Sequence, residues 1–411
     1  MIGDERRSRV VSVLSVVVNT LIVVYFSLLH ISQVSKASNL LSLVFMFLIC
    51  VILFLKKEKV FIPMNLFFLI AFAVFVAVSL LWSQTPENGG YWRAFRTVPL
   101  LTIMTILLCN YFKSSGQEKV LIWAVYISGF VLSVAMVFYS GGVSNTISLI
   151  RDGYRLGGLV ENENYLGMSI ASAAVVAFFF VIHEKRFWDI LTFLFFTLMT
   201  FATGSRTALL GLVVGVCLSV LFLLDFSRGH GRRNVTILFV ACASIVVFGV
   251  LIFTIPSFSG IKARTVSMVH SFLDRGGSRD GSTDARMGMV KLGFQAFCNH
   301  PFGGVGAGSS GLISDYGDLH NNYIEVLASY GIVGFVLYYL PFVLSIIQLF
   351  SAIKRRDRLC FIAVIINVCW FFNQLGMVTY ETKDSYFYLA LLVTLVEVSS
   401  IADGKTEKES L

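Results

Sequence analysis

An arginine stands where this chain leaves it little access to bulk water. Arg206 lies in "TFATGSRTALLGLVVG" (200–215), with one apolar run ending before it and another starting directly after it. An unpaired guanidinium near hydrocarbon is costly, and the planar guanidinium fork matches phosphate oxygens while remaining charged. The position therefore favours an anionic ligand at this edge. The alternative is an ordinary interfacial arginine that extends toward lipid headgroups.

A histidine stands at the start of another apolar segment, "DLHNNYIEVLASYGIVGF" (318–335). We expect His320 to open a membrane-spanning helix, with the amides of Asn321 and Asn322 and the carboxylate of Glu325 close behind it. An imidazole at the mouth of a helix bundle exchanges protons near neutral pH, as a general base must. The alternative is a helix-terminal histidine with a satisfied hydrogen bond.

A second candidate arginine, Arg286, lies near the start of the segment "DARMGMVKLGFQAFCNHP" (284–301). Its apolar residues have helical spacing and Pro301 follows them, which predicts an amphipathic helix along the membrane surface. Arg286 could also be a solvated residue on the polar face of that helix. The glycines of "FGGVGAGSSG" (302–311) favour close backbone packing or positive φ angles. They do not resemble a nucleotide P-loop, because no G-K-[ST] follows.

These residues must be positioned by membrane helices. Of the 411 residues, 56% are hydrophobic and only 14% are charged, with a mean hydropathy of +0.80. The apolar residues form blocks long enough to span a bilayer, which predicts an all-α polytopic membrane protein with about 12 transmembrane helices. The expected spans are 10–32, 39–55, 61–82, 98–112, 120–139, 164–182, 187–203, 207–226, 235–256, 323–350, 359–378 and 385–401.

The basic residues indicate how these spans are oriented. Lysines and arginines concentrate in alternate short junctions and at the amino terminus, which predicts that both termini are cytoplasmic. The net charge of +8 is mostly such a topology signal and gives no reason to expect nucleic acid. The seven cysteines lack a C-x-x-C motif and indicate neither disulfides nor a metal site. We expect a helical bundle over 1–256, an extracytoplasmic loop domain over 257–322, and further helices with a cytoplasmic tail over 323–411.

The segments "GSRTALLGL" (204–212), 284–308 and 319–335 together resemble the O-antigen ligase and O-antigen polymerase superfamily, in detail over about a third of the chain. The resemblance implies a GT-C-like glycosyltransferase of the bacterial cytoplasmic membrane that uses no cofactor or metal. Such an enzyme moves a glycan from an undecaprenyl-pyrophosphate carrier to a hydroxyl of an acceptor glycan on the extracytoplasmic face. The essential arginines of the family map onto Arg206 and Arg286, and its essential histidine maps onto His320.

The chemistry of these residue types agrees with that mapping. Two arginines can offset the charge of a departing pyrophosphate, while the imidazole takes the proton of the acceptor hydroxyl and the anomeric carbon is inverted. Six further polar residues are expected to bind substrate. A chain-length regulator and membrane lipids are expected as further partners. These candidate substrate-binding residues are Ser205, Asn321, Asn322, Arg93, Arg96 and Arg155.

Two reactions, and one other class of protein, are alternative functions that fit this sequence. The segment "ENENYLGMS" (161–169) looks more like polymerase members of the superfamily, so we favour polymerisation of carrier-linked repeats. Ligation of the glycan to a lipid A core oligosaccharide uses the same chemistry and is the alternative. A polysaccharide flippase or transporter also fits the number of spans. It is disfavoured because the spans are nearly free of internal charge and the polar residues gather at one face.

Overall fold

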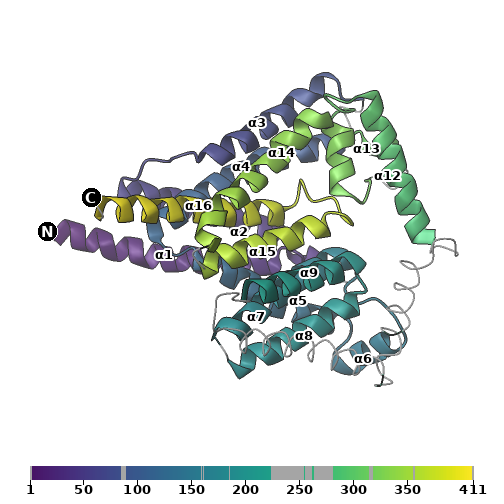
Figure 1. Cartoon of the computed structure of the whole chain (residues 1–411), viewed down its shortest axis with the longest axis horizontal. Helices are drawn as coiled ribbons and strands as arrows, with labels where there is room; N and C mark the ends of the chain where they lie inside the picture. Colours follow the sequence, from purple (N-terminus) through teal and green to yellow (C-terminus); the bar gives the residue numbers. More distant parts are fainter. Residues whose placement is uncertain are drawn as a thin grey trace.

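The computed structural model is a bundle of helices, without strands in the described part of the chain (Figure 1). It describes residues 2–84, 89–158, 160, 162–184, 186–223, 254, 262, 281–313, 318–354 and 357–409. The two ends of the described chain lie together at one end of the bundle, and α6, α12 and α13 lie toward the other (Figure 1). The predicted all-helical architecture is therefore confirmed.

The helices follow the predicted spans closely. Within the described residues, seven helices are long and apolar enough to cross a membrane, and α8, α9 and α15 are shorter apolar helices. Except for residue 254, the predicted span 235–256 lies outside the described residues, as does most of the loop after it, with Arg264, Arg275 and Arg279. The element bounds are α1 Ile2–Leu28, η1 Ser32–Val34, α2 Ser35–Lys56, α3 Met64–Val78, η2 Ser79–Leu81, α4 Gly89–Ser115, α5 Lys119–Tyr139, α6 Val143–Arg151, α7 Glu163–Glu184, α8 Phe187–Thr203, α9 Arg206–Leu223, α12 Gly281–Asn299, α13 Ser310–Ile313, α14 Asn322–Lys354, α15 Arg358–Asn373 and α16 Lys383–Glu409.

Helix α7 lies at the centre of one half of the bundle. It packs against α5, α8, α9 and α15, and every residue from 166 to 179 is buried. Its sequence there is rich in alanine, glycine and serine, which allow helices to approach closely where lipid provides no hydrophobic drive. In the other half, α14 packs against α3 and α16, and α16 packs against α4.

The polar segment 83–97, which lies between the predicted spans 61–82 and 98–112, is partly helical. Helix α4 begins at Gly89, so Arg93 and Arg96 lie on its first turns rather than in a loop. The arginines lower the hydropathy of the segment. Tyr91 and Ala94 are nevertheless fully buried, and their spacing marks a helix face packed against the bundle.

Two other boundaries differ from the prediction. Between the predicted spans 120–139 and 164–182 the chain forms the short helix α6, and α15 ends at Asn373 instead of continuing to residue 378. The residues after Asn373 leave the helix because their backbone bonds to other elements. Asn322 Oδ1 accepts the N–H groups of Thr379 at 2.7 Å and Tyr380 at 2.8 Å.

Helix α14 is broken near its start at Gly331, where φ is +62° and ψ is −166°. A break of this kind frees backbone carbonyls of the preceding turn, which must find other donors. The glycine-rich segment 302–311 supplies them: the N–H of Val305 bonds to Ala328 O at 2.9 Å, and the N–H of Gly306 bonds to Ser329 O at 3.0 Å. Gly304, Gly306 and Gly308 have positive φ angles, and a Cβ on each would lie within 2.5 Å of backbone atoms of another segment. The predicted positive φ angles and close backbone packing of this segment are therefore both confirmed.

Candidate active site

Arg206 is the first residue of α9 and follows a sharp turn out of α8. Gly204 ends α8 with φ +64°, a conformation that glycine adopts without strain. Ser205 is fully buried, and its Oγ accepts the N–H of Ala208 at 3.4 Å, as an N-cap residue does. The turn thus holds the half-buried Arg206 where the two helices meet.

Arg155 is held against this same turn. Its Nε donates to Thr203 O at 2.9 Å, and its Nη2 donates to Asn164 Oδ1 at 2.9 Å. Thr203 is the last residue of α8, so a cation meets a carbonyl that the helix itself leaves unpaired. Asn164 belongs to the segment 161–169, which begins α7.

Arg286 joins these two arginines from α12. Burial lowers the pKa of its guanidinium below the ordinary value, and the positive charges of Arg155 and Arg206 lower it further. Three guanidinium groups from separate elements are therefore near enough to repel one another, and we call Arg155, Arg206 and Arg286 the arginine cluster. In the described part of the chain, no carboxylate forms an ion pair with Arg286. A bound anion would remove the repulsion.

His320 lies in the loop before α14, two residues earlier than the helix start, so it does not open the span as predicted. Its φ is +49°, which costs a non-glycine residue about 1 kcal/mol. Asp318 stabilises this conformation, because its Oδ1 accepts the His320 N–H at 2.8 Å and also lies 3.0 Å from the imidazole Nδ1. The side chain of His320 is 30% exposed, so the ring is accessible.

Buried Glu325 fixes the loop that carries His320. Its Oε2 accepts the N–H of Leu319 at 3.0 Å, and Ser329 Oγ lies 3.4 Å from its Oε1. The prediction grouped Glu325 with the amides near His320, and the structure gives it a defined contact: it holds the backbone on the amino side of the imidazole.

Contacts on both sides of His320 bring it to the arginine cluster. Asn321 Nδ2 donates to Leu375 O at 3.4 Å, and a Cβ placed on the next residue, Gly376, would lie 2.7 Å from Thr207 Cγ2. These contacts link the residue after His320 to Thr207, the sequence neighbour of Arg206.

On the other side, Met289 of α12 packs with Leu319 in a small core cluster. Residues three apart lie on the same helix face, so Arg286 lies one turn from that contact. The three predicted catalytic residues therefore occur at the same end of the bundle.

Two of the predicted substrate-binding residues have their polar atoms engaged inside the fold. Asn322 is fully buried; besides accepting two backbone N–H groups, it donates to Tyr339 Oη at 2.7 Å and to Gln374 Oε1 at 3.1 Å. Ser205 is equally buried as the cap of α9. Neither side chain reaches the surface, and direct substrate contact by either one stays a prediction. The exposed-edge residue Asn321 caps α14, where its Oδ1 accepts the N–H of Ile324 at 3.1 Å.

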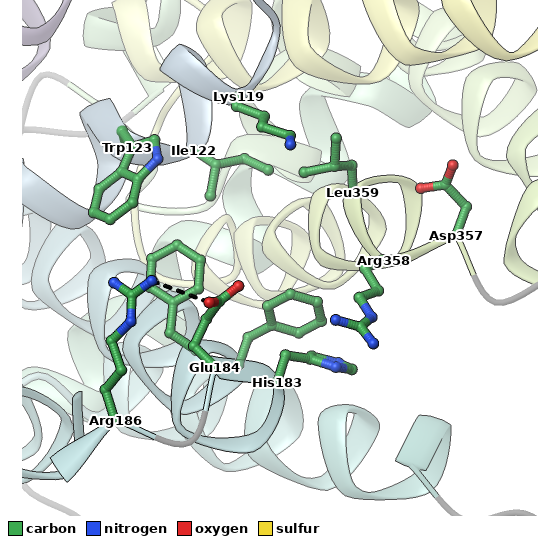
Figure 2. Close-up of a pocket in the computed structure, with 11 residues that line it drawn as sticks. Lys119, Ile122, Trp123, His183, Glu184, Arg186, Asp357, Arg358 and Leu359 are labelled. Atoms are coloured by element: carbon green, nitrogen blue, oxygen red, sulfur yellow. Dashed lines mark hydrogen bonds and ion pairs between the residues drawn. The ribbon is translucent and has the colours of Figure 1, made fainter.

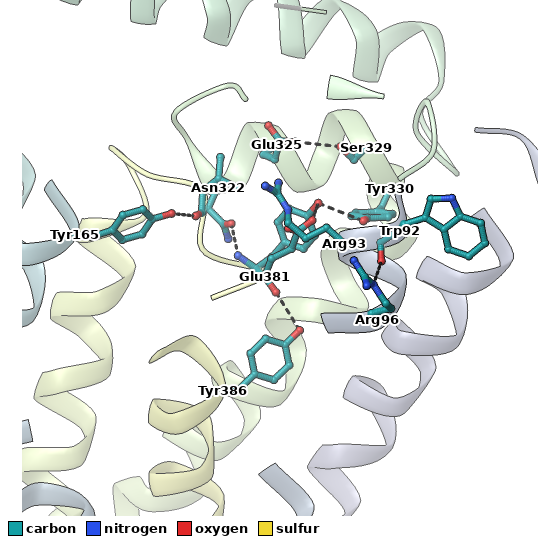
Figure 3. Close-up of polar contacts among 12 residues, drawn as sticks. Trp92, Arg93, Arg96, Tyr165, Asn322, Glu325, Ser329, Tyr330, Glu381 and Tyr386 are labelled. Carbon is teal, nitrogen blue, oxygen red and sulfur yellow. Dashed lines mark hydrogen bonds and ion pairs between the residues drawn. The ribbon is translucent and has the colours of Figure 1, made fainter. Parts of the chain in front are cut away.

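Arg93 and Arg96 belong to a second polar group, shown in Figure 3. Arg93 Nε donates to Glu381 Oε2 at 2.6 Å, and Tyr380 Oη donates to the other oxygen of that carboxylate at 2.7 Å. Arg96 Nε donates to Trp92 O at 3.1 Å. Of the three arginines predicted to bind substrate, Arg155 belongs to the arginine cluster. Arg93 and Arg96 are not among the charges that act on Arg286.

The sequence reasoning missed Asp318 and Glu381. Asp318 could have been found from its place two residues before a histidine, a spacing at which an aspartate accepts a backbone N–H. Glu381 had a weaker signal, an acidic residue between two spans on the side that carries the arginines. Among the described residues, no group of three or more His, Cys, Asp or Glu side chains is placed to hold a metal ion.

The fold and this site define a polytopic helical membrane protein with clustered arginines beside an accessible histidine at one end of the bundle. A family model for O-antigen ligase matches residues 191–339, from α8 into α14. This match supports the resemblance to the O-antigen ligase and polymerase superfamily that the sequence predicted. A search of curated proteins found no match. The matched region contains Arg206, Arg286 and His320, whereas Arg155 lies before it.

Proposed function

We propose that this protein is a membrane glycosyltransferase that moves a glycan from an undecaprenyl-pyrophosphate carrier to a hydroxyl of an acceptor glycan. The observation that supports this most directly is the arginine cluster, in which burial and then the charges of Arg155 and Arg206 lower the pKa of Arg286. Like charges are brought together in folded proteins at a cost, and a pyrophosphate is the anion whose charge and geometry offset it.

The arginine cluster would bind the pyrophosphate and stabilise it as it leaves. Negative charge on the bridging oxygen grows while the bond to the anomeric carbon breaks. Guanidinium groups already in position stabilise that charge with little reorganisation. Arg155 has two hydrogen bonds to the protein, so its contribution is chiefly a fixed positive field beside Arg206 and Arg286.

His320 would act as the general base. The acceptor hydroxyl gives its proton to the imidazole Nε2, and its oxygen forms the new bond to the anomeric carbon of the donor. The bond from that carbon to the carrier pyrophosphate breaks, and the pyrophosphate takes the electron pair, so the configuration is inverted. Asp318 Oδ1 lies 3.0 Å from Nδ1, so Nε2 is the ring nitrogen that would accept the proton.

The acceptor distinguishes two forms of this reaction. We favour polymerisation, in which another carrier-linked repeat is the acceptor, because of the segment that begins α7. Ligation to a lipid A core is the second candidate, and the match to the O-antigen ligase model favours it equally.

Purified full-length protein is incubated with carrier-linked repeats, first alone and then with a lipid-linked core oligosaccharide. Products that lengthen on carrier alone identify a polymerase, whereas products that require the core identify a ligase. No transfer with either acceptor, from protein that still elutes as a folded species, would contradict the proposed function.

A further inference from the structure

A pocket, drawn in Figure 2, lies at the end of α7 away from the arginine cluster. It has a volume of about 470 Å³ and is formed where α5 begins, α7 ends and α15 begins. Helices α7 and α15 each have the arginine-cluster end of the bundle at one terminus and this pocket at the other. The junctions around the pocket are those whose lysines and arginines predict a cytoplasmic face.

Two cationic side chains in the pocket are available to bind a ligand. Its two carboxylates are engaged: Asp357 Oδ1 accepts the N–H of Cys360 at 3.0 Å, and Glu184 pairs with Arg186 at 3.0 Å. Lys119 and Arg358 line the pocket from different helices, α5 and α15 (Figure 2). Neither forms an ion pair with any residue that the structure describes.

The rest of the wall is apolar and aromatic. Trp123 and Phe180 contact each other with ring centroids 5.1 Å apart, and Phe179 lies under His183 with centroids 4.2 Å apart. Trp123 remains 40% exposed at the edge of the pocket, one turn into a membrane-spanning helix. Tryptophan is enriched at this depth, where an apolar ring meets lipid chains and headgroups. The pocket therefore combines a cationic rim with an aromatic floor.

We propose that this pocket binds an anionic phospholipid of the leaflet on its own side of the membrane. Lys119 and Arg358 contact the headgroup phosphate, and an acyl chain lies against Trp123 and Phe180. Basic pockets between transmembrane helices on the cytoplasmic side take headgroups of this charge. Soluble phosphate would satisfy the two cations but would leave the aromatic floor without a partner, so the lipid fits the whole pocket better.

The test uses the full-length protein in vesicles of equal parts phosphatidylglycerol and phosphatidylcholine, followed by native mass spectrometry of the retained lipid. The wild type is expected to retain phosphatidylglycerol preferentially. The double variant Lys119→Gln with Arg358→Gln should retain about tenfold less, because each cation near a charged headgroup contributes about a few-fold in affinity. The matched control, Lys57→Gln with Lys59→Gln, removes the same charge from an exposed basic segment that does not line the pocket.

Two results would overturn the proposal. The first is equal retention of phosphatidylglycerol by the pocket variant and the control variant. The second is full displacement of the lipid by glycerol 3-phosphate, which would show that the phosphate alone is recognised. All four positions are exposed, so the substitutions leave the core unchanged, and elution volume checks that both variants fold.

Discussion

Arg155 Nε donates a hydrogen bond to the carbonyl oxygen of Thr203 at 2.9 Å, and this contact places a guanidinium beside the first residue of α9. Without it, Arg155 would be one more arginine on an outward loop. With this contact, Arg155 belongs to the arginine cluster although it lies 51 positions before Arg206 in the sequence. The first prediction concerns this contact.

Substitution Arg155→Lys is expected to lower the rate of glycan transfer about tenfold at subsaturating donor. An ammonium group cannot reproduce the guanidinium fork that reaches both Thr203 O and Asn164 Oδ1. Initial rates at several donor concentrations measure the effect. Arg151→Gln, a change at the exposed end of α6, should keep the wild-type rate. Equal loss in both variants would show that general surface charge, not the cluster, is responsible.

Substitution Arg286→Gln is expected to abolish transfer, by a hundredfold or more, without lowering thermal stability. The sign follows from the pKa shift. A guanidinium whose pKa is lowered in the folded state is less stable when charged there than in the unfolded chain, so removing the charge relieves repulsion. Melting temperature, measured with and without inorganic pyrophosphate, is the readout. Pyrophosphate should stabilise the wild type and have little effect on the variant. A strongly destabilised variant would indicate a structural role for Arg286.

Substitution His320→Asn should eliminate transfer while preserving the fold. Asparagine adopts positive φ more readily than most residues but cannot serve as the base, so it separates the conformation at φ +49° from the chemistry. His320→Gly should also be inactive, and it should be more stable than His320→Ala because glycine adopts this φ without strain. Transfer by His320→Asn at the wild-type rate would exclude the imidazole as the base.

Substitution Gly331→Ala is expected to destabilise the protein and reduce activity, although Gly331 contacts no substrate in the proposed mechanism. Its Cβ would lie 2.3 Å from Phe302 O, and the residue would retain a positive φ. The matched control is Gly288→Ala on α12, where an added Cβ meets nothing within 4 Å. Folded yield and melting temperature compare the two. Similar behaviour of both variants would mean that the break in α14 does not depend on glycine.

The sequence predicts the helices well because spans are encoded by local composition. Even the short apolar block 98–112 corresponds to a helix, α4. The turns of α4 before residue 98, which the hydropathy did not predict, have a buried face at Tyr91 and Ala94. The helix break at Gly331 could not be predicted. It depends on the backbone of residues 301–306, which supplies donors and an acceptor to α14 from a separate segment.

The sequence predicts which types of residue form the candidate site, but not every residue that belongs to it. Arg206, Arg286 and His320 have local signals, because each is a polar residue at the edge of an apolar or amphipathic segment. Arg155 was one of several outward arginines, and only the hydrogen bonds to Thr203 and Asn164 distinguish it from Arg93 and Arg96. Asn322 appeared to be a ligand because it follows His320, yet its burial depends on a loop more than fifty residues later.

The burial of α7 has a consequence for how the donor arrives. Its residues 166 to 179 are covered on all sides, and small side chains close the spaces between α7 and its neighbours. This part of the bundle is therefore a solid wall rather than a route between the leaflets. In the proposed reaction, the donor glycan would therefore not cross between the leaflets along α7.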